Sequence, residues 1–184
     1  PFYGGITLDR SLSTSRSVFE YTFKMLTDGE TSVPAGGMGE IPAQLAAGAR
    51  EAGVDVTLET PVVELSTDDR GAVVETAGET VAADAAVIAT DPPTARELTG
   101  VTSIPTEARS CVTQHVSLPD TQRLRVGRRI VLNAADDRPN QIAPMSAVAP
   151  EYAPEGRQLL SATFLGRQSA SDEELFEEVR EALA

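Results

Sequence analysis

The chain has 184 residues, and its 28 acidic residues outnumber its 15 basic ones, for a formal net charge of −13. A surface this acidic repels nucleic-acid phosphates and anionic lipid headgroups, so we expect no nucleic-acid partner. Its length permits a hydrophobic core, its one cysteine excludes an intrachain disulfide, and no apolar run is long enough for an integral membrane segment.

Two helices are predicted near the start of the chain. Apolar residues recur among polar ones over residues 13–26, a serine or threonine is available as the N-cap, and Gly29 ends the segment. A glycine-rich turn over residues 34–39 follows. Residues 41–52 then repeat apolar positions at helical spacing, with Pro42 in the first turn, where its missing N–H costs nothing.

Short strands are predicted next. Alternating or β-branched runs separated by turn residues predict strands over residues 54–58, 61–66, 72–76, 80–83 and 85–89. The last run, Ala-Ala-Val-Ile-Ala, is continuously apolar, which is typical of a strand buried on both faces. Asp91 and two prolines then open a short helix through Leu98.

The remainder of the chain predicts an antiparallel sheet and one helix. Strands are expected over residues 109–118, 129–132, 142–148 and 159–164. Ser171 and Glu174 form a capping box at the start of the last helix, whose abundant carboxylates are expected to face solvent. This order predicts an α+β fold, a mixed or antiparallel sheet flanked by helices, divided into residues 1–100 and 101–184.

The turn Gly36-Gly37-Met38-Gly39 is a candidate anion site, because backbone N–H groups and the helix dipole gather at a helix start. Its spacing departs from the dinucleotide fingerprint, since Pro42 stands where the third glycine belongs, and no Lys-Ser/Thr pair makes it a P-loop. A tight turn into a helix explains the same residues.

The only histidine, His115, lies four residues after Cys111 on one face of an expected strand. A nucleophilic pair would need a third, orienting group, and a zinc site would need more ligands. Packed strand residues are the simpler interpretation of both. Arg123, Arg125, Arg128 and Arg129 form one basic cluster without aromatic residues between them, which favours salt pairing or a partner contact over nucleic-acid binding.

The middle of the chain resembles the FAD-dependent amine oxidase superfamily, which includes phytoene desaturases and protoporphyrinogen oxidases. The resemblance rests on Pro34–Pro42, Gly53–Val56, Thr60–Leu65 and Ala86–Pro92, in that order. The segment Ala149–Gly156 is similar to one in the phytoene-desaturase-like branch.

The resemblance implies the substrate-domain portion of a FAD/NAD(P)-binding, Rossmann-type flavoenzyme. In relatives, the valine after the proline of the matching strand lends backbone groups to the adenine of FAD, which implies that Val62 binds the cofactor. The glycine fingerprint for the FAD pyrophosphate is absent from the 184 residues, so we expect FAD to be held together with the remainder of a parent chain. No residue is assigned as the catalytic base.

The implied reaction is hydride transfer from a small-molecule substrate, which could be an apolar polyene, a porphyrin-like compound or an amine. The alternative is a non-enzymatic α+β domain that binds a ligand or partner without the cofactor. The chain begins at Pro1 and its last helix has no stop signal, which indicates an internal segment of a larger protein.

Excess carboxylate with a single lysine, Lys24, predicts a protein kept soluble in concentrated salt, where screening removes the cost of self-repulsion. A GC-rich genome would explain the arginine and alanine content but not the acidic excess. We expect a halophilic, cytoplasmic protein, with peripheral docking at a membrane left open.

Overall fold

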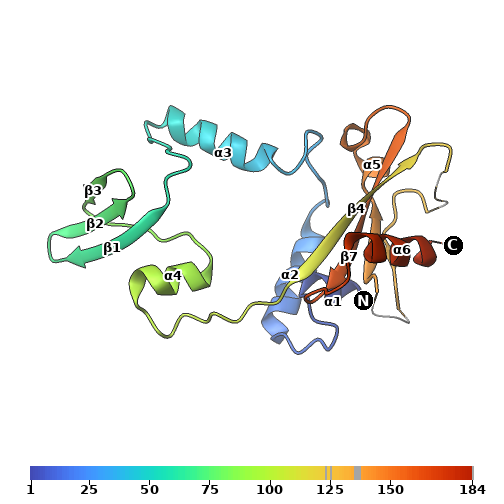
Figure 1. Ribbon diagram of the computed structural model, residues 1–184, viewed down its shortest axis with the longest axis horizontal. Helices are drawn as coiled ribbons and strands as arrows, with labels where there is room; N and C mark the ends of the chain where they lie inside the picture. Colours follow the sequence, from blue (N-terminus) through green and yellow to red (C-terminus); the bar gives the residue numbers. More distant parts are fainter. Residues whose placement is uncertain (123, 125, 135–137, 184) are drawn as a thin grey trace. The chain divides into compact units, whose positions relative to one another are not determined.

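The computed structural model describes residues 1–122, 124, 126–134 and 138–183, which form two compact units (Figure 1). The first unit combines Pro1–Leu45 with Arg109–Ala184, and the second is Ala46–Ala108. The boundary near residue 45 falls within helix α3 (Glu40–Glu51). The division differs from the expected one because the first 45 residues join the C-terminal part of the chain.

A four-stranded antiparallel sheet in the order β4-β7-β6-β5 forms the centre of the first unit. Its strands are β4 (Cys111–Pro119), β5 (Val131–Leu132), β6 (Gln141–Pro144) and β7 (Arg157–Leu165). The longest ladder joins β4 to β7, from Cys111 opposite Leu165 to Pro119 opposite Arg157. The α+β class with an antiparallel sheet is therefore confirmed.

One predicted strand ends earlier than expected. Residues 145–148 were expected to continue β6, but they form helix α5 (Met145–Val148), followed by the 3-10 turn η1 (Pro150–Tyr152). The hydroxyl of Ser146 accepts a hydrogen bond from the backbone N–H of Leu159 at 2.9 Å. The side chain thus takes the place of the backbone acceptor that a longer β6 would supply, and the ladder stops.

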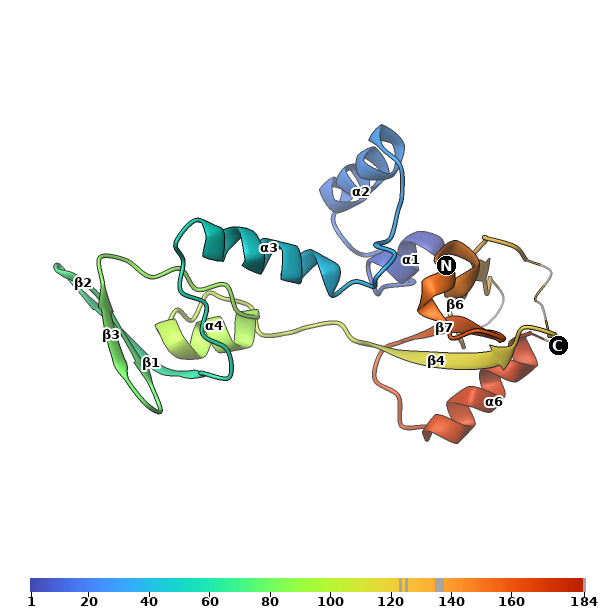
Figure 2. The same ribbon diagram turned by 90° about the horizontal axis from the view of Figure 1, so that it is seen from above.

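Helix α6 (Asp172–Ala182) covers one face of this sheet and closes the hydrophobic core (Figure 2). Leu175 and Val179 are buried against strand residues of the same face: Val116, Ile142, Leu160, Ala162 and Phe164. The predicted capping box is present, with the Ser171 hydroxyl accepting from the Glu174 N–H and the Glu174 carboxylate accepting from the Ser171 N–H. Each large buried side chain contributes about 1.5–3 kcal/mol to stability.

The opposite face of the sheet meets the N-terminal helix α1 (Phe2–Ile6), which is followed in the chain by α2 (Arg16–Asp28). Figure 2 shows α1 on the other side of the β4–β7 pair from α6. Gly5 packs closely here, because a Cβ on it would overlap the side-chain oxygen of Gln141, which would have to shift. No residue of α2 is buried, although the helix is rich in apolar side chains.

The second unit contains a three-stranded antiparallel sheet and one helix. Strands β1 (Val62–Asp68), β2 (Gly71–Thr76) and β3 (Thr80–Ala83) pair in that order. Helix α4 (Pro92–Thr99) contacts β1, with Asp91 as its N-cap. Both the predicted meander and the predicted short helix are confirmed.

Two predicted strands are wrong. Residues 54–58 and 85–89 form no ladder, and the side chain of Val87 is 93% exposed although its apolar run had indicated burial on both faces. A strand is stable only when its N–H and C=O groups pair with a neighbour. Among the described residues of this unit, neither segment has such a neighbour.

Candidate functional site

Val62 begins the edge strand β1, at an irregularity of the ladder. Val62 lies opposite Thr76 and Glu64 opposite Glu75, so Val63 is an extra residue at a β-bulge. No other strand pairs with the outer edge of β1 in the described part of the second unit. Unpaired backbone N–H and C=O groups on such an edge can hydrogen-bond a planar ring without using the side chain.

The face of β1 that meets α4 is hollowed. A cavity of about 380 Å³ is lined by residues of both elements: Val62, Val63, Glu64, Leu65, Thr94, Glu97 and Leu98. The Val62 side chain is 40% exposed, so a ligand can reach this part of the strand. The arrangement offers backbone groups on an edge strand beside a small cavity.

Asp91 fixes the start of α4 next to this cavity. Its carboxylate accepts hydrogen bonds from the Thr94 hydroxyl at 2.8 Å and the Thr94 backbone N–H at 3.1 Å. The Thr94 side chain, followed by the Thr94 backbone, lowers the pKa of Asp91 from its ordinary value of 3.8. The ionised carboxylate therefore holds the first turn of α4 at neutral pH.

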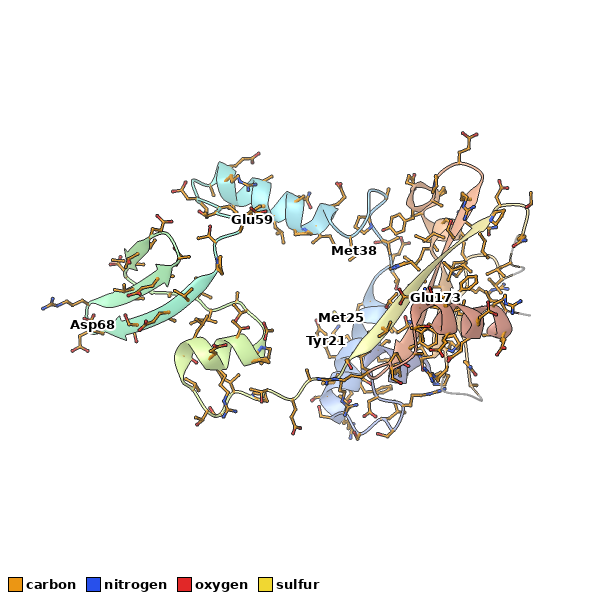
Figure 3. The ribbon with its side chains drawn as sticks, in the orientation of Figure 1. Tyr21, Met25, Met38, Glu59, Asp68 and Glu173 are labelled. Atoms are coloured by element: carbon orange, nitrogen blue, oxygen red, sulfur yellow. The ribbon has the colours of Figure 1, made fainter. Side chains whose placement is uncertain are left out.

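The glycine-rich turn does not form an anion site. A Cβ on Gly36 would lie 2.9 Å from Oε1 of Glu40, so the Glu40 carboxylate folds back over the turn at the start of α3 and repels an anion there. Tyr152 donates its hydroxyl to the Pro34 carbonyl at 2.7 Å, which fixes the turn, while Met38 is exposed (Figure 3). The tight-turn interpretation accounts for the geometry.

Cys111 and His115 do not form a catalytic pair. Both are exposed on β4, and four residues of strand separate their Cα atoms by roughly 13 Å. His115 lies opposite Ser161 in the ladder, and Thr113 lies opposite Thr163. These residues place polar, hydrogen-bonding side chains without carboxylates on the sheet face opposite α6.

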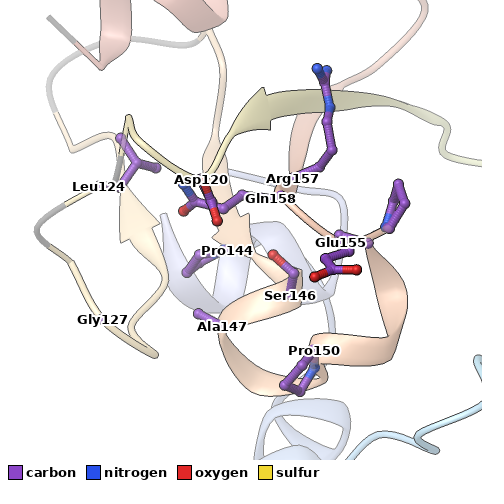
Figure 4. Close-up of a pocket in the computed structure, with 13 residues that line it drawn as sticks. Asp120, Leu124, Gly127, Pro144, Ser146, Ala147, Pro150, Glu155, Arg157 and Gln158 are labelled. Atoms are coloured by element: carbon purple, nitrogen blue, oxygen red, sulfur yellow. The ribbon is translucent and has the colours of Figure 1, made fainter.

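Residues of the segment Ala149–Gly156, which the sequence analysis had singled out, line a second cavity of about 470 Å³ in the first unit (Figure 4). Asp120, Ser146 and Glu155 supply polar groups to it. Beside it, the Arg157 Nε donates to the Ser117 hydroxyl at 2.9 Å. Sequence reasoning found the segment but not this cavity, because Asp120 and Ser146 reach it only through the pairing of β4, β6 and β7.

The remaining charged candidates are exposed, as Arg129 is, or have structural partners, or fall outside the described residues. Arg128 donates to the Ala147 carbonyl at 3.1 Å, while Arg123 and Arg125 lie outside the described part of the chain. On α6, Glu177 pairs with Arg180, and Glu178 lies 3.3 Å from Arg138. Within the described ranges, no three His, Cys, Asp or Glu side chains converge as metal ligands. A search of the same ranges finds no helix long and apolar enough to cross a bilayer.

Comparison with known proteins finds a matching family and similar solved structures. Residues 1–184 match the family model described as flavin containing amine oxidoreductase. The fold is similar to an oxidoreductase from Methanosarcina mazei, with a TM-score of 0.72 and 20% identity, over 99% of this chain and 46% of that one.

A second similar structure is a protein from Exiguobacterium sp. 255-15, provisionally named protoporphyrinogen oxidase, with a TM-score of 0.61 and 20% identity. That match covers 90% of this chain and 39% of the other. The chain thus spans less than half the length of both solved structures. None of the curated proteins matches it.

Proposed function

Because the chain belongs to the flavin-containing amine oxidoreductase family, we propose that it forms part of an oxidoreductase that removes a hydride from a C–H bond of a small molecule, which in an amine is the C–H bond next to the nitrogen. FAD is the cofactor that the family implies, and when bound it accepts the hydride. The observation that carries the proposal is the family match over all 184 residues.

The residues of this chain fit only one end of FAD. The 184 residues contain no G-x-G-x-x-G loop for a pyrophosphate, and Glu40 covers the one glycine-rich helix start. Val62 offers main-chain groups on an edge strand beside a cavity. We assign the adenine contact to the backbone of Val62, and the rest of FAD to residues outside this chain.

The substrate is proposed to be an apolar molecule or an amine, bound in a protein that works in the cytoplasm. On the sheet face opposite α6, the four neighbouring residues Thr113, His115, Ser161 and Thr163 include no carboxylate despite the acidic composition. This face offers no carboxylate to pair with a cationic group, which supports an uncharged substrate. None of these four residues is assigned a proton-transfer role.

Visible absorbance of the chain, extended to the length of its structural relatives and purified in concentrated KCl, tests the proposal. We expect flavin bands that survive desalting, and turnover with amines, porphyrinogens or polyenes. A folded, colourless protein that fails to take up added FAD would replace the proposal with the non-enzymatic ligand- or partner-binding domain.

The Val62 assignment needs a variant that changes the backbone rather than the side chain. Val62→Pro removes the N–H group, whereas the matched control Val62→Ala keeps both backbone groups. In the extended protein, we expect Val62→Pro to weaken FAD binding about tenfold, the effect of one lost hydrogen bond. We expect Val62→Ala to change it little. Equal affinity of both variants, with unchanged circular dichroism, would remove Val62 from the site.

A further inference from the structure

The second unit, Ala46–Ala108, has almost no hydrophobic core of its own. Among its residues, all of which the structure describes, Ala72 is the only one that is buried. The hydrophobic cluster around Leu160 and Phe164 lies entirely in the first unit. A folded unit must remove enough apolar surface from water to offset the conformational entropy that it loses on ordering. The second unit does not do so within these 184 residues.

The barest apolar surface of this unit lies in residues 85–89, which run from β3 to α4 without regular structure (Figure 1). We call this stretch the unpaired segment. Val87, at its centre, is 93% exposed, more than any other large hydrophobic side chain in the described ranges. Ala86 and Ile88 alternate with Val87 and are half-buried. One side of the unpaired segment is therefore partly covered, and the other side is bare.

The backbone of the unpaired segment is open as well. Residues 85–89 make no hydrogen bond to any other described residue. An apolar run with free N–H and C=O groups can pair with strands from another source. The segment also contains no lysine, proline or other charged residue of the kind that keeps exposed strands apart. It has the properties of a strand whose neighbours are not among these 184 residues.

The composition of the unpaired segment is that of an inner strand. A continuous apolar run is typical of a strand with both faces covered, whereas a strand with one solvated face alternates with polar residues. Residues 54–58 show the second pattern, because Val54, Val56 and Leu58 alternate with Asp55 and Thr57. The run Ala-Ala-Val-Ile-Ala has no such alternation. Its burial would therefore require neighbouring strands on both sides and cover on both faces.

The similar solved structures indicate where these neighbours come from. This chain matches almost its whole length to the Methanosarcina mazei oxidoreductase, yet more than half of that protein lies outside the match. The same is true of the Exiguobacterium protein. The fold of this chain is therefore found embedded in a longer polypeptide. A second copy of the chain is disfavoured as the partner, because two molecules of net charge −13 repel each other.

We propose that the unpaired segment becomes an inner strand of a sheet whose other strands come from the same polypeptide beyond these 184 residues. The interaction is strand addition, in which backbone hydrogen bonds give the affinity and the apolar side chains are buried on both faces. The proposal rests on the exposed apolar run and on the family match, and not on the reaction. The second unit then gains its core only when this sheet forms, whereas the first unit already has one.

Hydrogen–deuterium exchange read by mass spectrometry tests the pairing, because backbone N–H groups exchange slowly only when they are hydrogen-bonded or buried. In the 184-residue chain, we expect residues 85–89 to exchange at close to the rate of an unfolded peptide, while the β4–β7 ladder is protected. In the chain extended to the length of its structural relatives, we expect exchange of residues 85–89 to slow by at least about a hundredfold.

Val87→Asp places a carboxylate in the unpaired segment, and Val101→Asp is the matched control at another exposed valine of the same unit. We expect Val87→Asp to leave exchange in the 184-residue chain unchanged. In the extended protein it should accelerate exchange of residues 85–89 at least about tenfold, because a buried carboxylate without a partner is unfavourable. Val101→Asp should change it less than about twofold. The milder Val87→Thr keeps the β-branched shape and should have a smaller effect of the same direction.

Fast exchange of residues 85–89 in the extended protein would overturn the proposal, and so would equal effects of the two aspartate variants. Protection in the 184-residue chain that increases with its concentration would identify a second copy as the partner instead. Flavin content is read separately from visible absorbance. A colourless extended protein with protected residues 85–89 overturns the proposed function alone. Bound flavin with unprotected residues 85–89 overturns the strand addition alone.

Discussion

Asp9 and Arg109 form an ion pair across 100 residues of sequence, with Nη1 of Arg109 at 2.6 Å from Oδ2 of Asp9. The Arg109 Nη2 also donates to the Ser13 hydroxyl at 3.2 Å. The Asp9 side chain is largely buried, and the same carboxylate shapes the segment between α1 and α2. One carboxylate thus joins the segment between α1 and α2 to the residues that lead into β4.

We expect Asp9→Ala to lower the free energy of unfolding by about 1–3 kcal/mol, because it leaves several donors without their acceptor. Arg109→Ala should lower the free energy of unfolding by less, about 0–1 kcal/mol, because the arginine is half-exposed and solvent screens the ion pair. Urea unfolding of both variants and of the double variant measures their coupling. Strictly additive losses would contradict the ion pair.

Substitution of Leu160 tests the hydrophobic core between the sheet and α6. Its side chain is 0% exposed, so Leu160→Ala should lower the unfolding free energy by about 2–5 kcal/mol through lost burial and a residual cavity. Leu132→Ala is the matched control, because this leucine of the same sheet is 37% exposed. A similar loss in both variants by thermal or urea unfolding would argue against this core.

The lowered pKa of Asp91 predicts that the stability of the first turn of α4 depends on pH. Its folded pKa is lowered below the ordinary value, so its stabilising effect is complete above that value and is lost as pH falls through the lowered pKa. Carboxyl chemical shifts recorded during an NMR titration should show this. Thr94→Val removes the largest cause and should raise the pKa of Asp91 towards its usual range. An unchanged titration in this variant would refute the assignment.

The acidic composition predicts stability that rises with salt. At a net charge of −13, screening by concentrated KCl should weaken self-repulsion, since the Debye length falls from about 10 Å at 0.1 M to about 3 Å at 1 M. We expect the unfolding midpoint to increase with KCl, and sucrose at matched osmolality to reproduce only part of the gain. Equal midpoints in dilute buffer and in concentrated KCl would contradict a halophilic origin.

Local signals in the sequence were sufficient for α2, α3, α4 and α6, but they predicted neither α1 nor α5. The capping box of Ser171 and Glu174, the Asp91 cap and the end of α2 at Gly29 each act within one or two turns of chain. Their free energies depend on neighbours three or four residues away, so the sequence displays them directly. The β1–β2–β3 meander was equally accessible because short turns join its strands.

Only the tertiary structure decided which apolar segments are buried and which side chains meet. Residues 54–58 and 85–89 have strand-like composition, but strands need partners, and a periodic pattern does not supply one. The link from Asp9 to Arg109, the carboxylate over Gly36 and the row of rings from Phe2 to Phe23 also depend on distant or turn-specific contacts. The sequence by itself determined the α+β class, the charge and the family resemblance, because composition, periodicity and motif order are properties of the chain alone.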